Sequence, residues 1–218
     1  MKILHFKTKR IILNAKIRGM KLQIYIIPLF FFILLSTASA TEKIVMLRHA
    51  EKPAKGLGQL NCQGLNRALA LPSILIKKFG IPSVIFSPNP SVSKKDHGQF
   101  YNYIRPLATI EPTAIRLGMP VNTVFGFDDI KSLKEALYNP IYENSIIYVV
   151  WEHHILETMT RELLLDLGKD PREVPKWEDN DFDSIYVVTI TDGNDGHKKV
   201  TFMKDNEGLN NSQTSCPN

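Results

Sequence analysis

The sequence contains 218 residues, with 27 Lys or Arg, 22 Asp or Glu and a formal net charge of +5. Seven of the basic residues and none of the acidic ones lie in residues 1–40, which leaves 20 basic against 22 acidic residues in the rest. The net positive charge of the chain therefore comes from the first 40 residues. It is not evidence of a nucleic-acid-binding protein. Residues 41–218 are enough for one domain with a sizeable core.

Residues 1–40 have the three parts of a secretory signal peptide. A basic segment comes first, an apolar run follows at residues 24–35, and small residues end in Ala38-Ser39-Ala40. The apolar run is shorter than the roughly 20 residues that cross a bilayer, which favours cleavage after Ala40 over an uncleaved membrane anchor. Translation starts at Met1 or at Met20. We expect a secreted or periplasmic protein with no stable membrane insertion after cleavage.

Two cysteines, Cys62 and Cys216, follow this segment. An oxidising compartment permits a disulfide between them, which would tie the C-terminal end to the first helix; two unpaired thiols are the alternative. The sequence has no Cys-x-x-Cys and no clustered spacing of metal ligands, so it predicts no metal site.

The first predicted strand ends in two residues suited to phosphate chemistry. Residues 44–47 are all apolar and include β-branched members, which predicts a strand buried on both faces of a parallel sheet. Arg48 and His49 follow at the end of this strand, and ligands of open α/β folds bind at that edge of the sheet. An Arg presents a fork of donors to phosphate oxygens, and a neutral His can attack phosphorus.

Helices and strands alternate through the middle of the chain. The sequence predicts, in order, a loop at residues 56–60, a helix capped by Asn61 that runs to about Phe79 and is kinked or divided at Pro72, a strand at 84–86, a surface loop at 91–100, a helix at 105–117, and a helix capped by Asp128 or Asp129 that ends near Tyr138. The buried side of the first helix is expected to consist of Leu65, Leu69, Ile76 and Phe79.

The last third begins with the strongest predicted strand, residues 146–151, which ends in Glu152-His153-His154. A helix at about 155–167, a long loop at 171–183, and a hairpin of strands at 184–191 and 198–203 follow. This alternation predicts one α/β domain at residues 41–205, with a mostly parallel sheet and a C-terminal antiparallel hairpin. Residues 206–218 are expected to form a polar, mobile tail.

Arg48-His49 after a buried strand resembles the Arg-His-Gly signature of the histidine phosphatase superfamily, which includes phosphoglycerate mutases and histidine acid phosphatases. Ala50 replaces the glycine. Arg105, which opens a helix after the second strand, matches the family's second Arg, and His153, which ends a later strand, matches its last His. The resemblance covers nearly all of the chain after residue 40. It implies a phosphoglycerate mutase-like, three-layer sandwich with a central sheet flanked by helices.

The resemblance also implies a mechanism. His49 attacks the phosphoryl group and forms a phosphohistidine, while Arg48, Arg105 and His153 neutralise charge on the equatorial oxygens. Water then releases phosphate. No metal or other cofactor is expected, because two Arg and one His supply the positive charge.

Four further residues are candidates for substrate binding or proton donation. Lys52 stands where the phytase-like branch of the family has a basic residue. The proton donor is expected to be Glu51, Asp128 or Asp129, with the last two slightly ahead because mutase-like members take their acid from that region.

Two residues flank His153. Alternation along a strand predicts that the side chain of Glu152 points away from the site, in a supporting role. His154 stands where phytases have Asp and mutases have Gly, so the usual proton donor of phytases is not found there.

We expect an exported phosphatase that acts on a small phosphorylated substrate or a phosphoprotein. One alternative is a phosphate-binding module with little turnover on the same fold. A phosphomutase is another, although export would remove it from glycolytic substrates. Nucleic acid is not an expected partner.

Overall fold

The computed structural model describes residues 41–193 and 196–217. The predicted signal peptide at residues 1–40 lies outside the described residues. Within the described ranges, none of the helices has the length and apolarity needed to cross a membrane.

A five-stranded sheet in the order β2-β5-β1-β6-β7 forms the centre of the domain. The parallel part consists of β1 (Thr41–Arg48), β5 (Ile146–Trp151) and β2 (Val84–Phe86). β6 (Ser184–Asp192) pairs antiparallel with β1, and β7 (Lys198–Asn206) pairs antiparallel with β6. The predicted sheet with its antiparallel C-terminal hairpin is confirmed.

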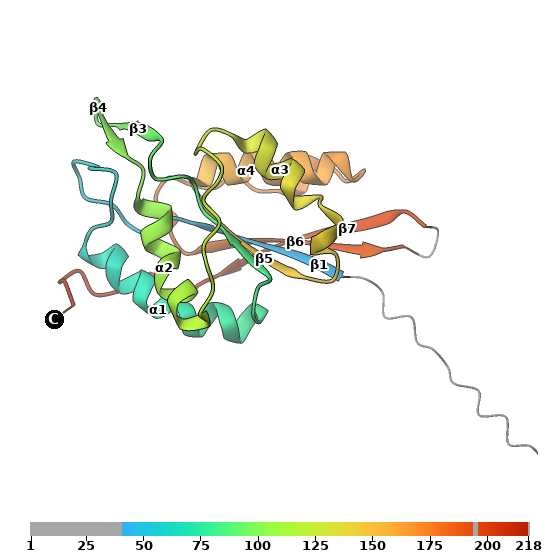
Figure 1. The fold of residues 1–218 in the computed structure, drawn as a ribbon, viewed down its shortest axis with the longest axis horizontal. Coiled ribbons are helices and arrows are strands. Elements are labelled where there is room, and N and C mark those ends of the chain that lie inside the picture. Colours follow the sequence, from blue (N-terminus) through green and yellow to red (C-terminus); the bar gives the residue numbers. More distant parts are fainter. Residues whose placement is uncertain (1–40, 194–195, 218) are drawn as a thin grey trace, which may run out of the picture. The chain divides into compact units, whose positions relative to one another are not determined.

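Two layers of helices cover this sheet (Figure 1). Alternating side chains of β1 divide between them: Val45 and Leu47 pack with α1 (Cys62–Phe79) and α2 (Arg105–Leu117). Ile44 and Met46 pack instead with α3 (Ile130–Leu137) and α4 (His153–Asp166). Burial on both faces explains why β1 is continuously apolar, and it confirms the three-layer prediction.

Helix α1 begins after Asn61, whose side chain accepts a hydrogen bond from the backbone N–H of Gly64, and it continues through Pro72 as one helix. The buried side differs from the prediction. Leu65 and Leu69 are 38% and 52% exposed, whereas the buried residues are Gly64, Arg67, Ala68, Leu71, Pro72, Leu75 and Phe79. The apolar pattern misled the prediction because Arg67, a charged residue, belongs to the buried side.

The segment predicted as a surface loop contains a hairpin of β3 (Ser93–Asp96) and β4 (Gln99–Asn102). Its turn residues, His97 and Gly98, both have positive φ, as a two-residue type I′ turn requires. The loop prediction was wrong here because β3 is polar and lacks the apolar alternation that marks a strand.

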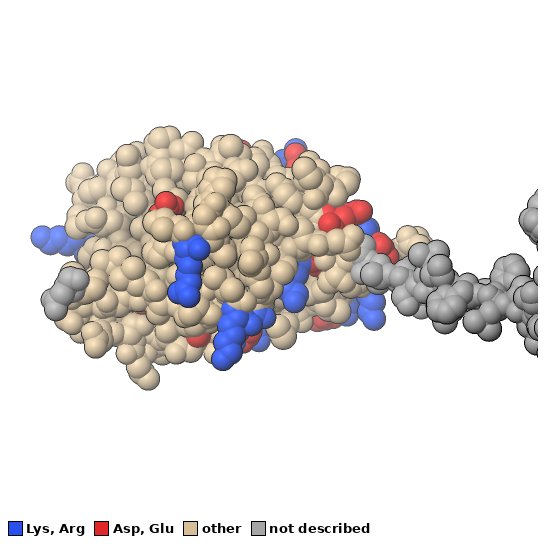
Figure 2. All heavy atoms as spheres, turned by 60° about the horizontal axis from the view of Figure 1, so that its bottom comes forward, with Lys and Arg blue, Asp and Glu red and all other residues tan. Residues whose placement is uncertain are grey.

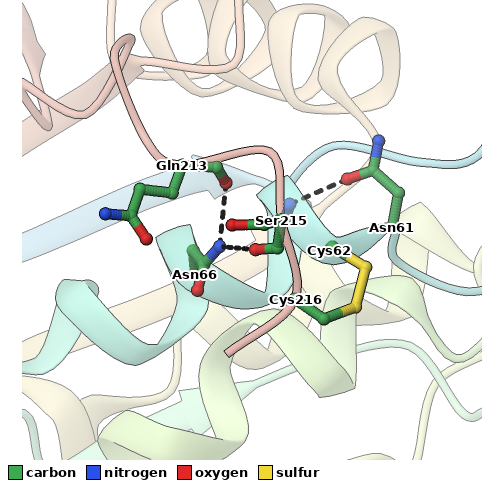
Figure 3. Close-up of a disulfide and its surroundings, with 7 residues drawn as sticks. Asn61, Cys62, Asn66, Gln213, Ser215 and Cys216 are labelled. Carbon is green, nitrogen blue, oxygen red and sulfur yellow. Dashed lines mark hydrogen bonds between the residues drawn. A yellow bond between two sulfur atoms is a disulfide. The ribbon is translucent and has the colours of Figure 1, made fainter. Parts of the chain in front are cut away.

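The C-terminal tail, which was expected to be mobile, is held against α1. Asn66 donates hydrogen bonds to the backbone carbonyls of Gln213 and Ser215 (Figure 3). Cys62 and Cys216 form a disulfide, with their Cα atoms 4.5 Å apart, which selects the first of the two alternatives for these cysteines.

On the face shown in Figure 2, Lys and Arg side chains are scattered among largely uncharged residues, with Asp and Glu side chains among them. Surface ion pairs such as Lys198–Glu143, in which both side chains are exposed, contribute about 0–1 kcal/mol each. The apolar side chains buried on the two faces of the sheet therefore contribute more to stability than these surface pairs do.

Candidate active site

The predicted site residues meet where β1 and β5 end. The backbone N–H of His49 donates to the carbonyl oxygen of Trp151 at 2.9 Å, so the parallel pairing of the two strands continues beyond Arg48. The chain after β5 enters α4 directly, and His153 is the first residue of that helix. Arg48-His49 and His153 therefore leave the sheet at the same edge.

The ring of His49 is buried, and its Nδ1 lies 2.8 Å from the carbonyl oxygen of Ala50. A carbonyl only accepts, so Nδ1 carries the proton and Nε2 keeps its lone pair. Burial, reinforced by the positive charges of Arg105 and Arg48, lowers the pKa of His49 well below 6.5. The ring is therefore neutral at physiological pH, as a nucleophile must be.

Ala50 fits where the resembled family has glycine. The φ angle of Ala50 is not positive, so the backbone at this position does not require glycine and accommodates a side chain. Its N–H donates to Oγ1 of Thr109 in α2, and the Thr109 hydroxyl donates to the carbonyl oxygen of Arg105. This chain of hydrogen bonds fixes the start of α2 beside His49.

Arg105 is buried at the start of α2, and its Nη1 donates to Oδ2 of Asp96 at the end of β3. Lys52 lies 3.4 Å from the other oxygen of the same carboxylate. Burial alone would raise the pKa of Asp96, but the hydrogen bond and charge of Arg105, with the charge of Lys52, hold it below its usual range. Sequence reasoning missed Asp96, because the pairing of β3 with β4 was not predicted.

Arg48 is held by the loop before β6. Its Nη1 donates to the backbone carbonyls of Asp179 and Asp181 at 2.8 and 3.0 Å, and its Cζ lies 3.8 Å from the centre of the Phe182 ring. Burial lowers the pKa of Arg48 to about 10, against the opposing charge of Glu152, so the guanidinium stays charged at neutral pH. The sequence predicted a loop at residues 171–183, but nothing in it indicated that this loop or Phe182 contacts Arg48.

Both guanidinium groups retain donors for a ligand. The Nε atoms of Arg48 and Arg105 are buried and have no hydrogen-bond partner among the described residues. The hydroxyl of Tyr103 is also buried and has no hydrogen-bond partner among the described residues. The Tyr103 ring contacts the His49 ring edge-on, with 6.1 Å between the ring centroids. Burial raises the pKa of Tyr103, so it is a hydrogen donor at neutral pH. An anion bound beside His49 would satisfy such donors.

His153 is buried between two carboxylates. Its Nδ1 lies 2.6 Å from Oε1 of Glu152, and its Nε2 lies 3.1 Å from Oδ1 of Asp179. Burial would raise the pKa of Glu152, but its hydrogen bond with His153 and the positive charges of His153 and Lys94 lower it to about 2. The prediction that Glu152 points away was wrong, because β5 ends at Trp151 and Glu152 instead caps α4, accepting from the N–H of Ile155.

The remaining candidates lie differently. Glu51 is buried, and both of its carboxylate oxygens accept hydrogen bonds from Arg67, so its part in substrate binding or proton donation stays a prediction. Asp128 and Asp129 are exposed, and the side chain of Asp129 makes no capping hydrogen bond to α3. Phe127 packs on Tyr103 with 5.8 Å between centroids, so this segment borders the site.

No protein-family model and no curated protein matches this chain. Among solved structures, a mycobacterial glucosyl-3-phosphoglycerate phosphatase in complex with inorganic phosphate is similar, with 14% identity and a TM-score of 0.50 over 75% of this chain and 95% of that one. A phosphoserine phosphatase mutant from Entamoeba histolytica has 16% identity and a TM-score of 0.46 over 77% and 98% of the two chains. A phosphoglycerate mutase from Plasmodium falciparum has 13% identity and a TM-score of 0.44 over 74% and 89%. At this identity the likeness to the glucosyl-3-phosphoglycerate phosphatase, with a TM-score of 0.50, establishes the fold alone: the described part of the chain has a phosphoglycerate mutase-like fold.

Proposed function

We propose that this chain is an exported phosphatase of the histidine phosphatase superfamily, which hydrolyses phosphomonoesters through a phosphohistidine at His49. The observation that carries the proposal is the state of His49: a neutral imidazole with its Nε2 lone pair free, beside Arg48 and Arg105. The unpartnered Nε donors of both arginines support an anionic ligand next to this nucleophile.

In the proposed reaction, the Nε2 lone pair of His49 forms a bond to phosphorus while the bond to the ester oxygen breaks. Arg48, Arg105 and His153 stabilise charge on the transferring group. The leaving oxygen takes a proton from Asp128 or Asp129, or departs as the anion when the leaving group is acidic. A water molecule then attacks phosphorus while the bond between phosphorus and Nε2 of His49 breaks; the proton of the water passes to the carboxylate or to the departing phosphate, and neutral His49 is restored.

Export is supported by two features that lie at opposite ends of the chain. The first 40 residues have the composition of a cleavable signal peptide. The Cys62–Cys216 disulfide is of a kind that persists in oxidising compartments.

A phosphate-binding module with little turnover is the second candidate. Asp96 already occupies an outer nitrogen of Arg105, and backbone carbonyls occupy one of Arg48, so a substrate must compete for part of each guanidinium. Hydrolysis of 4-nitrophenyl phosphate, which needs little help with its leaving group, separates the two candidates.

The decisive experiment uses protein starting at Thr41, rapid quenching with a 32P-labelled phosphomonoester, and mapping of the acid-labile phosphopeptide. The label should lie on His49. His49→Ala should abolish turnover, whereas His97→Ala, which changes an exposed histidine in the β3–β4 turn, should not. A label on another residue, or normal turnover in His49→Ala, would exclude the mechanism.

A further inference from the structure

A second cluster of ligating side chains adjoins His153. The rings of His153 and His154 stack with 3.9 Å between centroids and 34° between planes. Oδ1 of Asp179 lies 3.1 Å from Nε2 of His153 and 2.8 Å from Nε2 of His154. One carboxylate oxygen thus faces two imidazole nitrogens, an arrangement hidden in the sequence because Asp179 lies 26 residues after His153.

Glu152 lies behind His153. Its Oε1 is 2.6 Å from Nδ1 of His153, although Nδ1 makes no hydrogen bond with the geometry required of one among the described residues. Nε2, the other ring nitrogen, faces Asp179 and is the atom that would bind an ion in place of its proton. A carboxylate behind a histidine ligand is the arrangement that orients metal-binding imidazoles and raises their basicity.

We propose that His153, His154 and Asp179 bind a divalent transition-metal ion of the Zn²⁺ type at the edge of the active site, and that the bound ion inhibits the enzyme. Two imidazoles and a carboxylate are a donor set that Zn²⁺ accepts, at about 2.0–2.2 Å per ligand. Asp179 lies 3.1 Å and 2.8 Å from the two imidazoles. The neighbouring group of Glu152, His153 and His154, which does not include Asp179, also has one possible ligand atom from each residue within 4.8 Å of the others. Small movements of the exposed Asp179 and His154 side chains would open the space for an ion.

The inhibitory part rests on the proposed function. Nε2 of His153 is the atom that would donate to the transferring phosphoryl group, and it cannot donate while it binds a metal ion. The metal also fixes Asp179, whose backbone carbonyl accepts from Arg48. Binding should therefore withdraw His153 from phosphate and restrain the loop that positions Arg48.

Metal binding is tested without reference to activity. Protein starting at Thr41 is titrated with Zn²⁺ by calorimetry and with Co²⁺ by its visible absorption, which is intense for low-coordinate nitrogen and oxygen sites. His154→Gln and Asp179→Asn should each weaken binding by more than the roughly 10- to 100-fold lost with an outer partner of a ligand. His97→Gln removes an exposed histidine elsewhere and should leave binding unchanged. Equal affinity in wild type and His154→Gln, or no binding in wild type, would overturn the site.

Inhibition is tested separately with 4-nitrophenyl phosphate. Zn²⁺ should inhibit wild type and His97→Gln, and a chelator should restore both. His154→Gln should keep its basal turnover, because His154 is 54% exposed and has no role in the proposed reaction, but should resist Zn²⁺. Zn²⁺ that binds without inhibiting would overturn the inhibitory part alone. A protein with no phosphatase activity would refute the proposed function, while the titrations would still decide the metal site.

Discussion

Nη1 of Arg67 donates a hydrogen bond to Oε2 of Glu207 at 2.5 Å, and both side chains are buried. The same guanidinium also binds Glu51, in the segment that follows His49 and Ala50, and Asp183, which precedes β6. One cation therefore joins α1, the segment after β1, the start of the β6–β7 hairpin and the C-terminal tail. The segment that carries His49 and the tail depend on the same buried charge.

Replacing Arg67 should be costly. Arg67→Met would leave three acidic side chains in the interior without the guanidinium that they contact, and breaking a buried ion pair costs about 3–5 kcal/mol. Urea unfolding measures the loss. Lys78→Met, which removes a partly exposed pair with Asp205, should cost at most about 1 kcal/mol. Similar losses in the two variants would show that the Arg67 cluster is not a major source of stability.

Glu207 should make stability fall as pH rises. Burial raises its pKa to about 8, although Arg67 opposes this, whereas the unfolded chain has the ordinary value of 4.5. Between these values the unfolded state releases a proton that the folded state keeps, so the free energy of unfolding decreases with pH by up to about 1.4 kcal/mol per unit. Glu207→Gln should flatten this dependence between about pH 5 and pH 8 in unfolding titrations. An unchanged slope would mean that Glu207 is ionised in the folded protein.

The contribution of the disulfide to the free energy of unfolding should also be measurable by urea unfolding. Cys62 and Cys216 are separated by 154 residues, and a cross-link over a long loop typically stabilises by about 2–4 kcal/mol. The double variant Cys62→Ser, Cys216→Ser should lose that amount and become insensitive to reductant, unlike wild type. Thiol labelling of both cysteines in denatured, unreduced exported protein would rule out the bond.

The sequence predicted the elements whose signal is local. β1 and β5 are continuous apolar runs because both faces of the sheet are covered, and the ends of parallel strands lie at one edge, so Arg48, His49 and His153 were placed together. Whether they perform the predicted chemistry stays a prediction.

Partners set by long-range packing were not predictable. Asp96 reaches Arg105 only because polar strands form a hairpin, and Asp179 reaches His153 from a loop with no periodic pattern. From the sequence, Arg67 is expected on the exposed side of α1, because charged residues usually face solvent. Its burial depends on acidic side chains from three other segments of the chain, which the sequence does not place next to it.

Asp96 should compete with phosphate for Arg105. Its carboxylate accepts from Arg105 and faces Lys52, two groups suited to phosphate oxygens. A hydrogen bond to a charged group contributes about 1.5–3 kcal/mol, so Asp96→Asn should lower the inhibition constant of inorganic phosphate by about tenfold. Ser93→Ala, in the same strand, serves as the control. Weaker phosphate inhibition in Asp96→Asn would show instead that the carboxylate positions Arg105 for binding.

His49 should stay neutral in mildly acidic solution. Its pKa lies well below 6.5 because the ring is buried, and the charge of Arg105 adds to this effect. Ring nitrogen chemical shifts in 15N-histidine-labelled protein, assigned by comparison with His49→Gln, should show no protonation of His49 as the pH passes through about 6.5.

The lowered pKa of His49 also makes the free energy of unfolding depend on pH. Below about pH 6.5 the unfolded chain protonates this histidine while the folded protein does not, so its contribution is fully present above that pH and is lost as the pH falls. The free energy of unfolding of wild type should therefore drop more steeply than that of His49→Gln between about pH 6.5 and pH 5, by up to about 1.4 kcal/mol per unit. If His49 titrates at or above 6.5 in the folded protein, its lone pair is not held ready for phosphorus, and the buried ring beside two arginines must serve to bind an anion rather than to attack it.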